Sequence, residues 1–335
     1  MTATNAPVIV IVPPVEKGTT APEYLAERGC QVIINREPYP PVRPQDLMRL
    51  LRDADGAIIG GLEQVSDDVM AACPRLRALS RVGVGLNNID IEAATRRGIA
   101  VCSTPGSNSR AVAELAMALM GMLVRKAVFQ HSYFQDGRND RLTGIQLLDK
   151  TLSIIGLGRI GKLVAGLAQA YGMKVIACDI APDHAFADPR GIPFVSHEEA
   201  FRQADVLTLH VPLTPLTRGM VRAETLAWMK PGAYLINTAR GPVVEIKAVA
   251  AALKSGQLAG YATDVPIVEG FVDPELNGLE NVITTPHIGG YTTEALVKGF
   301  EMAAVNVLDM LAGKSTEFTV NPAVFAQKEK SASNR

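Results

Sequence analysis

Residues 152–180, LSIIGLGRIGKLVAGLAQAYGMKVIACDI, constrain the fold more than any other stretch of this sequence. An apolar run predicts a strand at 152–155, and after a glycine-rich turn apolar residues recur at helical spacing from Ile160 to Tyr171. A second apolar run, at 174–178, predicts another strand. A strand, a helix and a strand in this order predict a right-handed crossover between two parallel strands. The stretch therefore indicates an α/β protein built on a parallel sheet.

The same alternation of short β-branched runs and helical patterns continues along nearly the whole chain. The predicted strands lie at 8–12, 32–34, 57–59, 100–102, 152–155, 174–178, 206–210, 234–237 and 281–284. This rhythm predicts doubly wound parallel sheets with helices on both faces. Because the chain has 335 residues, we expect two such domains.

Two matched junctions suggest where the domains meet. VCSTPGSNS (101–109) and VITTPHIGG (282–290) each end a predicted strand with Thr-Pro and a glycine, and long apolar helices follow near 108–125 and 293–312. Two such junctions favour two chain crossings that form a hinge over a cleft. The alternative is that both are ordinary loops within one large sheet. The two-crossing interpretation divides the chain into a substrate-binding domain of 1–105 plus 292–325, a nucleotide-binding domain of 106–291 and a disordered tail of 326–335.

Composition limits the partners and the compartment of the protein. Lys and Arg total 33 against 34 for Asp and Glu, a net charge of −1 that gives no support for a nucleic acid or an anionic membrane as partner. The most apolar stretch, 111–124, is shorter than the roughly 20 residues that span a bilayer, and the N-terminus lacks the basic region of a signal peptide. The four cysteines, which show no CxxC spacing, are Cys30, Cys73, Cys102 and Cys178. They favour reduced thiols over a disulfide or a metal site, so we expect a metal-free, cytoplasmic protein.

Three glycines in the turn form a GxGxxG motif, and each has its own physical purpose. Gly156 allows a tight turn, Gly158 lets the backbone approach a pyrophosphate, and Gly161 lets the helix pack closely on the strand. The pyrophosphate would lie at the helix N-terminus, where free N–H groups and the helix dipole favour an anion. Asp179, 23 residues after Gly156 (179 − 156), would accept hydrogen bonds from the adenosine ribose. No Arg or Lys follows it before Arg190, so we predict NAD rather than NADP as the cofactor.

Hydride transfer between a nicotinamide and a carbonyl carbon also needs a proton donor and a cation that holds the substrate. Histidine is the usual proton donor near neutral pH, and His287 ends a predicted strand at the edge where ligands bind in α/β sheets. His210 ends another strand, where a cofactor could lie against it. The other histidines lie in polar stretches and are expected to be solvated: His131, His184 and His197.

A cation and a carboxylate accompany His287 at strand ends or in the loops that follow them. Arg240, in INTARGP (236–242), follows a predicted strand. Glu269, 18 residues before His287 (287 − 269), would raise the imidazole pKa and fix its tautomer. Singly each is ambiguous, because loop glutamates are mostly solvated, strand-end arginines mostly form salt bridges and lone histidines are mostly structural. Their joint occurrence after the nucleotide motif favours a catalytic set.

From about residue 76 to residue 322, the chain resembles the D-isomer-specific 2-hydroxyacid dehydrogenases. The matching stretches are RVGVGLNNID (81–90), RRGIAVCSTPGSNSRAVAELA (96–116), TLSIIGLGRIG (151–161), ADVLTLHVPLT (204–214), INTARG (236–241), ATDVPIVE (262–269), TPHIGG (285–290) and VNPAV (320–324). This resemblance implies two Rossmann-like domains joined by two crossings, NAD bound to the middle domain, and a homodimer or dimer of dimers. It also implies an oxidoreductase that acts on the CH–OH group of a small 2-hydroxy acid.

The resemblance implies roles for individual residues as well. His287 would exchange the proton of the substrate C2 hydroxyl, Glu269 would pair with it, and Arg240 would bind the substrate carboxylate and polarise the C2 oxygen. Backbone N–H groups of Val84 and Gly85 would hold the carboxylate from the other domain. NAD would contact Thr104, Gly156, Gly158, Arg159, Ile160, Gly161, Asp179, His210, Val211, Thr217, Thr238, Arg240, Asp264 and the His287–Gly290 turn with Gly289 and Gly290.

Some positions depart from the family pattern. Asn87 stands where aspartate is common. Pro266 and Gly270 replace an aromatic residue and a proline in the loop that carries Glu269. This loop is therefore expected to differ in shape from that of its relatives, which bears on the pairing of Glu269 with His287.

The substrate is left open by the sequence. Arg81 occupies a substrate-side position that is basic in the phosphoglycerate-oxidising members of the family, and Arg96 and Arg97 would add charge unless they are exposed helix-end residues. A phosphorylated acid such as 3-phosphoglycerate and short acids such as glyoxylate or hydroxypyruvate all fit. No regulatory domain is expected after residue 325. The alternative functions are a non-enzymatic NAD(H)-sensing protein of the corepressor type and a dehydrogenase of a small anion such as formate.

Overall fold

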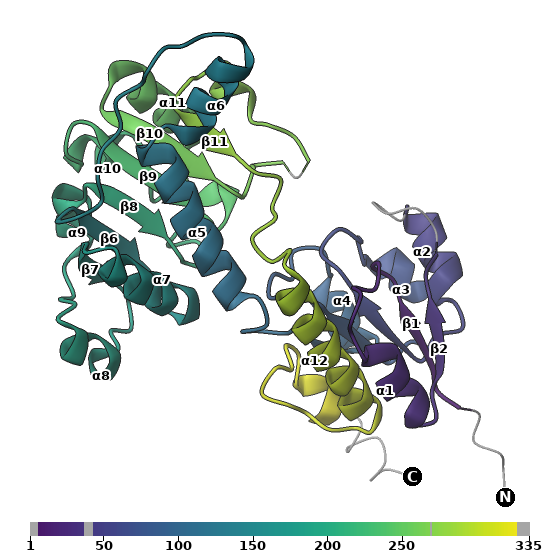
Figure 1. Ribbon diagram of the computed structural model, residues 1–335. Coiled ribbons are helices and arrows are strands. Elements are labelled where there is room, and N and C mark those ends of the chain that lie inside the picture. The colour runs from purple at the N-terminus through teal and green to yellow at the C-terminus, as the bar shows by residue number, and fades with distance from the viewer. Residues whose placement is uncertain (1–5, 37–42, 269, 327–335) are drawn as a thin grey trace, which may run out of the picture. The chain divides into compact units, whose positions relative to one another are not determined.

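The computed structural model describes residues 6–36, 43–268 and 270–326. The chain divides into two compact units (Figure 1). Unit 1 comprises the N-terminal segment up to Asn108 and the segment that begins at Tyr291, and unit 2 is Ser109–Gly290. Residues 327–335, most of the tail expected to be disordered, lie outside the described residues.

In the part of the chain that the structure describes, unit 1 is built on a five-stranded parallel sheet in the order β2-β1-β3-β4-β5. The strands are β1 (Val8–Ile11), β2 (Gln31–Ile34), β3 (Gly56–Ile59), β4 (Ala78–Arg81) and β5 (Ala100–Cys102). The helices are α1 (Ala21–Glu27), α2 (Pro44–Leu51), α3 (Asp67–Ala71), α4 (Ile91–Arg96) and α12 (Thr293–Leu311). Successive side chains along β1 and the residue after it pack into two cores. Ile9 and Ile11 pack with α1 and α12, while Val10 and Val12 pack with α2, α3 and α4.

Helix α12 belongs to unit 1 although it lies near the C-terminal end of the chain. Its buried residues Phe300, Ala303, Ala304 and Val307 follow the spacing of a single helical face. The face packs closely on the sheet, since a Cβ added to Gly56 would lie only 2.7 Å from Val307 Cγ2. The distant C-terminal segment is thereby bound to the first half of the chain.

Over its described residues, unit 2 is built on a six-stranded sheet in the order β11-β10-β9-β8-β6-β7, and every neighbouring pair is parallel. The strands are β6 (Thr151–Ile155), β7 (Lys174–Cys178), β8 (Val206–Leu209), β9 (Ala233–Asn237), β10 (Leu258–Thr263) and β11 (Val282–Thr284). Because all six strands run in one direction, the residues that follow them meet at a single edge of the sheet. That edge carries the glycine-rich turn and Asp179, His210, Arg240, Asp264 and His287.

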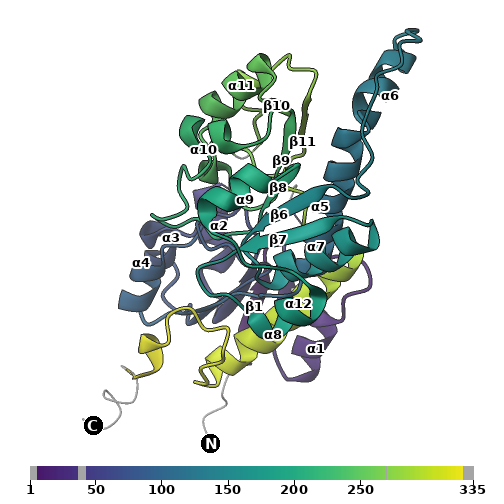
Figure 2. The same ribbon diagram turned by 90° about the vertical axis from the view of Figure 1, so that its left-hand side faces the viewer.

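The helices of unit 2 pack around this sheet. They are α5 (Ser109–Val124), α6 (Ala127–Gln135), α7 (Arg159–Ala170), α8 (His184–Ala187), α9 (His197–Gln203), α10 (Ala223–Trp228) and α11 (Ile246–Ser255), with short 3-10 helices at Asp188–Arg190, Gly241–Val243 and Pro274–Leu276. Figure 2 shows α6 continuing beyond the end of α5, away from the sheet. Within the described ranges, no helix combines the length and the apolar character that crossing a bilayer requires.

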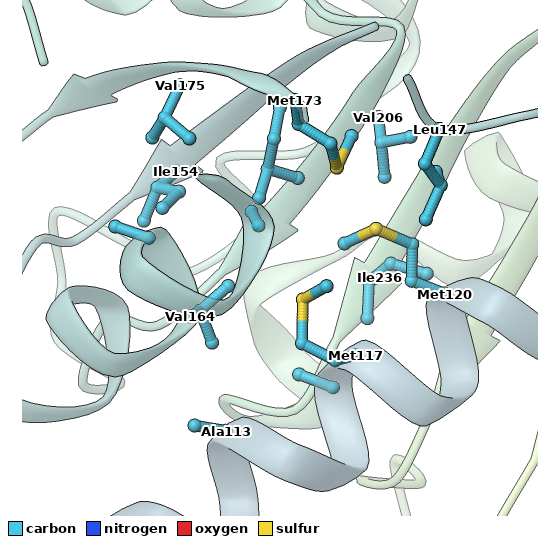
Figure 3. Packing of buried hydrophobic residues seen from close by; sticks show 14 of the residues in the cluster. Ala113, Met117, Met120, Leu147, Ile154, Val164, Met173, Val175, Val206 and Ile236 are labelled. Atoms are coloured by element: carbon cyan, nitrogen blue, oxygen red, sulfur yellow. The ribbon is translucent and has the colours of Figure 1, made fainter. Parts of the chain in front are cut away.

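The core of unit 2 forms where α5 lies against α7 and the sheet. Ala113, Met117 and Met120 of α5 point toward Val164 of α7 and toward Ile236 of β9 (Figure 3). Methionine side chains are unbranched and fill irregular gaps, which suits a contact between two helices and a twisted sheet. This packing supports the strand and the helix that flank the glycine-rich turn.

The predicted α/β fold of parallel sheets is confirmed, but two strands escaped the sequence pattern. Strand β4 (Ala78–Arg81) reads ALSR and β10 (Leu258–Thr263) reads LAGYAT. Both are poor in β-branched residues, so local propensity favours no strand there. They form because each lies between two other strands of its sheet, where backbone pairing and burial override propensity.

Candidate active site

The glycine-rich turn after β6 depends on glycine at two positions for different reasons. Gly156 has φ +95°, and a Cβ there would lie 2.6 Å from the carbonyl oxygen of His210. Both the left-handed backbone and the close approach of β8 therefore require glycine. A Cβ on Gly161, in the first turn of α7, would collide with the carbonyl oxygen of Gly156. The motif thus brings helix and strand together as the sequence predicts.

The N-terminus of α7 is suited to an anion. Its N-cap is Gly158, and no side chain of the described residues caps the helix by a hydrogen bond. Gly158 and Arg159 are exposed, and a Cβ added to Gly158 would meet nothing within 4 Å. Since no side chain of the described residues bonds to them, the first N–H groups of the helix, together with the helix dipole, favour negative charge. These features fit the pyrophosphate of a dinucleotide.

Asp179 lies beside this turn and is held by backbone donors. Its Oδ2 accepts a hydrogen bond from Leu157 N–H (2.7 Å) and its Oδ1 accepts one from Ala181 N–H (2.9 Å). Each carboxylate oxygen keeps further acceptor capacity, which fits ribose hydroxyl groups. The nearby cation Lys162 is paired with Asp183 at 2.5 Å. The chemistry of this corner thus suits a free ribose better than a 2′-phosphate.

His210 is placed among hydroxyl groups at the end of β8. Its Nε2 lies 3.0 Å from Thr208 Oγ1 and its Nδ1 3.5 Å from Thr238 Oγ1. Burial lowers the pKa of His210 to about 3, because the charged imidazolium would lose its hydration. The ring is therefore neutral near neutral pH and unsuited to acid–base exchange there. Its carbonyl oxygen, packed on Gly156, shapes the turn instead.

Thr217 stabilises the loop after β8 by hydrogen bonds to other residues of the same loop. The Thr217 hydroxyl donates to the carbonyl oxygen of Pro212 (2.6 Å) and accepts from Thr214 N–H (2.9 Å). The side chain is 8% exposed, so its predicted contact with the cofactor would have to coexist with these bonds. Val211, in the same loop, is half-buried.

Arg240 follows β9 in a segment that is fixed by a buried asparagine. Asn237 is 0% exposed, donates from Nδ2 to the Arg240 carbonyl oxygen (3.0 Å) and accepts from Ala239 N–H at Oδ1 (3.0 Å). The Arg240 side chain is half-buried, and its Nη1 donates to the Ala239 carbonyl oxygen (2.6 Å). The sequence analysis did not single out Asn237, although an asparagine at the end of a strand commonly hydrogen-bonds to the backbone of the loop that follows.

The next residue links Arg240 to the loop that carries Glu269. A Cβ on Gly241 would lie 2.6 Å from the carbonyl oxygen of Pro266, so the two backbone segments touch. Glu269 itself lies outside the described residues, and its pairing with His287 stays a prediction. In the same loop, Ile267 N–H donates to Asp273 Oδ2 (3.4 Å).

His287 has an unusual backbone conformation. Its φ is +56°, in the left-handed region that residues with a Cβ rarely adopt. Its N–H donates to the carbonyl oxygen of Thr285 (3.0 Å), which closes a tight turn, and its side chain is half-buried. Strain of this kind persists only where neighbouring groups hold it in place.

Asp264, at the end of β10, supplies that hold. Its Oδ1 accepts hydrogen bonds from Thr285 Oγ1 (2.6 Å) and Ile288 N–H (2.8 Å), and its Oδ2 accepts one from Gly289 N–H (2.7 Å). The side chain is 2% exposed. A Cβ on Gly289 would lie 2.8 Å from Asp264 Oδ2, so glycine is needed there for the close approach. The residue predicted as a cofactor contact is thus bonded on both oxygens to the turn that carries His287.

Two of the three histidines expected to be solvated are exposed, but the third is not. His131 and His184 lie at the surface. His197 packs against Phe201 and Trp228 with ring centroids 4.9 and 6.1 Å away, and its Nε2 is buried. Burial lowers the pKa of His197. The expectation for His197 was wrong because this residue begins α9 and its ring packs against the aromatic side chains of Phe201 and Trp228.

The candidate substrate loop of unit 1 follows β4. Gly83 has φ +120°, its N–H donates to Thr104 Oγ1 (2.6 Å), and its carbonyl oxygen accepts from Thr104 N–H (2.9 Å). Thr104 is wholly buried. Val84 is 46% exposed and Gly85 half-buried, so this segment of backbone lies at the surface of unit 1. The loop is shaped by Gly83 and Thr104 rather than by the residues predicted to bind substrate.

The sequence of unit 2 matches a known domain type. Residues 117–289 match the NAD binding domain of the D-isomer specific 2-hydroxyacid dehydrogenases, which is more than half of the 335 residues. The chain belongs to this family. The resemblance found in the sequence motifs is thereby confirmed, and NAD is the cofactor of the matched domain.

Relatives of this chain are found among curated enzymes and solved structures. The D-3-phosphoglycerate dehydrogenase of Rattus norvegicus is 38% identical over 301 residues, which are 89% of this chain and 56% of that enzyme. This chain therefore spans little more than half the length of that relative. The TT0316 protein of Thermus thermophilus has a TM-score of 0.84 at 34% identity, covering 93% of this chain and 99% of that one. A D-lactate dehydrogenase of Aquifex aeolicus, solved with NAD and lactic acid, has a TM-score of 0.79 at 27% identity, covering 94% and 99%.

Proposed function

We propose that this chain is an NAD-dependent D-2-hydroxyacid dehydrogenase that interconverts a small 2-hydroxy acid and the corresponding 2-oxo acid. The observation that carries the proposal is the carboxyl edge of the unit 2 sheet. Strands that all end at that edge are followed by a helix N-terminus without a side-chain cap, by the Asp179 carboxylate and by His287 with its left-handed backbone. Family membership favours the same activity.

In the proposed reaction, unit 2 holds the cofactor and moves the proton. The N–H groups at the start of α7 and the carboxylate of Asp179 would bind NAD, which when bound accepts or supplies the hydride. His287 would take the proton of the C2 hydroxyl during oxidation and return it during reduction. Arg240 would hold the substrate carboxylate and polarise the C2 oxygen. Glu269 would pair with His287 and stabilise its charged form.

Unit 1 is proposed to contribute anion-binding groups of its own. The N–H groups of Val84 and Gly85 lie in a loop whose path is set by Gly83 and Thr104. Backbone donors fixed in this way bind a carboxylate without the entropy cost of ordering long side chains. Arg81, which ends β4, would add positive charge.

The direct test is a screen of NADH oxidation with glyoxylate, pyruvate, hydroxypyruvate, its 3-phosphate ester and longer 2-oxo acids. Reduction of at least one of these acids, and no oxidation of formate, is the expected result. NADH binding should be measured in parallel by the change in its fluorescence. A protein that binds NADH but reduces none of the acids would contradict the proposal and would favour a cofactor-sensing role.

We also propose that the protein assembles as a homodimer or a dimer of dimers. Helix α6 supports this, because two of its apolar side chains, Val128 and Phe134, are exposed, whereas Phe129 packs against the core of unit 2. Phe134 alone is 72% exposed. Apolar side chains gathered on one exposed helix favour a partner surface. Light scattering of the wild-type protein should give a mass of at least twice the 35.7 kDa of one chain. The measured mass should be lower for Phe134→Glu. A wild-type mass equal to that of one chain would contradict the proposal.

We propose a reducing compartment such as the cytoplasm for the protein. All four cysteines are free, and three of them are buried. Burial raises the pKa of Cys73 to about 11, which makes this thiol unreactive. Thiols of this kind are typical of proteins that do not rely on disulfides.

A further inference from the structure

A buried tyrosine of unit 2 lies near the turn that carries Arg240. Tyr261 stands in the second half of β10, and its side chain is 1% exposed. Thr263 ends the same strand two residues later, so its side chain lies on the same face of the sheet. Asn237 ends β9 and pairs with Thr263 in the parallel register. The three polar side chains are therefore neighbours on one face of the sheet, at the edge where the strands end.

The hydroxyl group of Tyr261 interacts with both of these neighbours. Burial raises the pKa of Tyr261 to about 12, while hydrogen bonds with the side chains of Thr263 and Asn237 act in the opposite direction. The phenol is therefore un-ionised near neutral pH and keeps its proton for a hydrogen bond. Since Thr263 and Asn237 are themselves 2% and 0% exposed, water does not compete with the phenol for them.

Each neighbour of Tyr261 binds the backbone of a different loop. Asn237 donates to the carbonyl oxygen of Arg240 in the turn after β9 (3.0 Å). The Thr263 hydroxyl accepts from Val265 N–H (3.1 Å) and donates to the Val265 carbonyl oxygen (3.3 Å) in the loop after β10. Tyr261 thus connects the turn that carries Arg240 with the loop that follows its own strand.

The two loops also touch directly. A Cβ on Gly241, the residue after Arg240, would lie 2.6 Å from the Pro266 carbonyl oxygen. A contact of this kind sets how closely the loops can approach, but it does not stop them from separating. The hydrogen bonds of Tyr261 oppose separation, because it would leave a buried hydroxyl group without a partner.

We infer that Tyr261 is a positioning residue for substrate binding, an inference that rests on the proposed function. Its hydroxyl group acts through Asn237 on the backbone of Arg240 and fixes where the guanidinium group meets the substrate carboxylate. A binding group that is held in place beforehand avoids the free-energy cost of being ordered when the substrate binds. Because Tyr261 is buried, it does this without touching the substrate.

The test is Tyr261→Phe, which keeps the ring and removes the hydroxyl group. NADH is the reductant, and the substrate is whichever of glyoxylate, pyruvate and hydroxypyruvate the wild-type protein reduces fastest. KM for this acid should rise by about three- to tenfold, the size expected for one lost hydrogen bond, and kcat should change less. NADH affinity should stay unchanged, because the turn after β6 is untouched.

A second measurement follows the Arg240 turn itself. The amide hydrogens of residues 239–244, several of which are bonded within this turn, should exchange faster in Tyr261→Phe than in the wild-type protein. An unchanged KM would overturn the inference and leave the proposed function intact. A wild-type protein that reduces none of the acids would instead overturn the proposed function, and the inference with it.

Tyr234→Phe is the matched control. Tyr234 is also buried, but it lies near the amino end of β9, in the core that α5 and α7 form with the sheet. This variant also removes the hydroxyl group of a buried tyrosine and should leave KM unchanged. An equal rise of KM in both variants would overturn the inference, since a general loss of packing would then explain the result.

The route through Asn237 is tested by combining two substitutions. Asn237→Ala removes the link between Tyr261 and Arg240, so adding Tyr261→Phe to it should raise KM little further. The same fold-rise of KM with and without Asn237 would overturn the inference, because Tyr261 would then act independently of that link. NADH affinity, measured on the same preparations, shows that the variants are folded.

Discussion

Two turns at the same edge of the unit 2 sheet each contain a residue with a left-handed backbone, but the residue is a glycine in one turn and a histidine in the other. The turn after β6 adopts a left-handed backbone at Gly156, with φ +95°, and the turn after β11 adopts one at His287, with φ +56°. Glycine takes that conformation without strain, whereas histidine does so at a cost of roughly 1–3 kcal/mol. The first turn needs little support, and the second is held by three hydrogen bonds to Asp264.

The difference is the one expected if the two turns have the roles proposed for them. A turn that offers only backbone to its ligand can use glycine, and there the absence of a side chain is the useful property. A turn that must present an imidazole cannot use glycine, so the strain has to be offset by a buried carboxylate. Strain held in place at one residue and avoided at another is typical of a position where the side chain has a function. The comparison therefore predicts separate effects for mutations in the two turns.

The largest effect is expected from His287→Ala. If His287 exchanges the substrate proton, kcat should fall by about 10²- to 10⁴-fold, because general acid–base catalysis contributes that much. NADH affinity, measured by fluorescence titration, should change little, since the turn after β6 is untouched. Loss of NADH binding together with activity would break the distinction between the two turns.

Gly161→Ala should have the reverse effect. Its Cβ would collide with the carbonyl oxygen of Gly156, so the turn and α7 must separate. Overpacking of this kind costs about 1–3 kcal/mol, and we expect it as weaker NADH binding and a lower free energy of unfolding. Gly166→Ala is the matched control, because it lies in the same helix and its Cβ would meet nothing within 4 Å. Gly166→Ala should not lower the free energy of unfolding, because Ala favours a helix more than Gly does. Equal losses in the two variants would show that the close contact with Gly156 is not the cause.

Asp264→Asn tests the support of the second turn. The carbonyl oxygen of Asn can accept from Thr285 and Ile288, but its NH2 group would face the N–H of Gly289. A misplaced imidazole should lower kcat by about tenfold, as expected when a buried donor loses its acceptor. NADH affinity should change less than kcat. If NADH affinity falls and kcat does not, Asp264 serves the cofactor rather than His287.

The control for Asp264→Asn is Asp205, a half-buried carboxylate at the other end of the sheet that also pairs with Lys230 (2.8 Å). Asp205 Oδ2 accepts from Thr151 N–H (2.7 Å) at the start of β6. Asp205→Asn should lower the free energy of unfolding without lowering kcat. A fall in kcat of similar size in both variants would mean that lost stability, not the position of His287, explains the result.

The sequence predicted the structure of the glycine-rich turn more completely than that of the turn that carries His287, and the reason is physical. Gly156, Gly158 and Gly161 act through their own backbones, so their identity and spacing already state their purpose. The hold on His287 comes from Asp264, which lies 23 residues earlier (287 − 264) and is brought near only by the pairing of β10 with β11. Strand β10 itself escaped the pattern, because its small residues carry no strand signal.

The same limit applies to the other contacts made across the sheet. Asn237 could have been noticed as an amide at a strand end, but its bond to the Arg240 carbonyl oxygen depends on the local turn. The position of Arg81 between Gly61 and Gly83 depends on the adjacency of β3 and β4, and β4 too was missed. Motifs that act through contiguous backbone were predictable, whereas supports from neighbouring strands were not.

The smallest effect, and the most direct measure of strain, is expected from His287→Gly. Glycine relieves the left-handed backbone, so this variant should be more stable than His287→Ala by about 1 kcal/mol in denaturant unfolding. Both variants lack the imidazole, so their difference isolates the backbone and both should be equally inactive. Equal stabilities would mean that the turn is not strained at His287, and the contrast with Gly156 would lose its meaning. A more stable but inactive His287→Gly would indicate that this turn gives up stability in order to present a side chain.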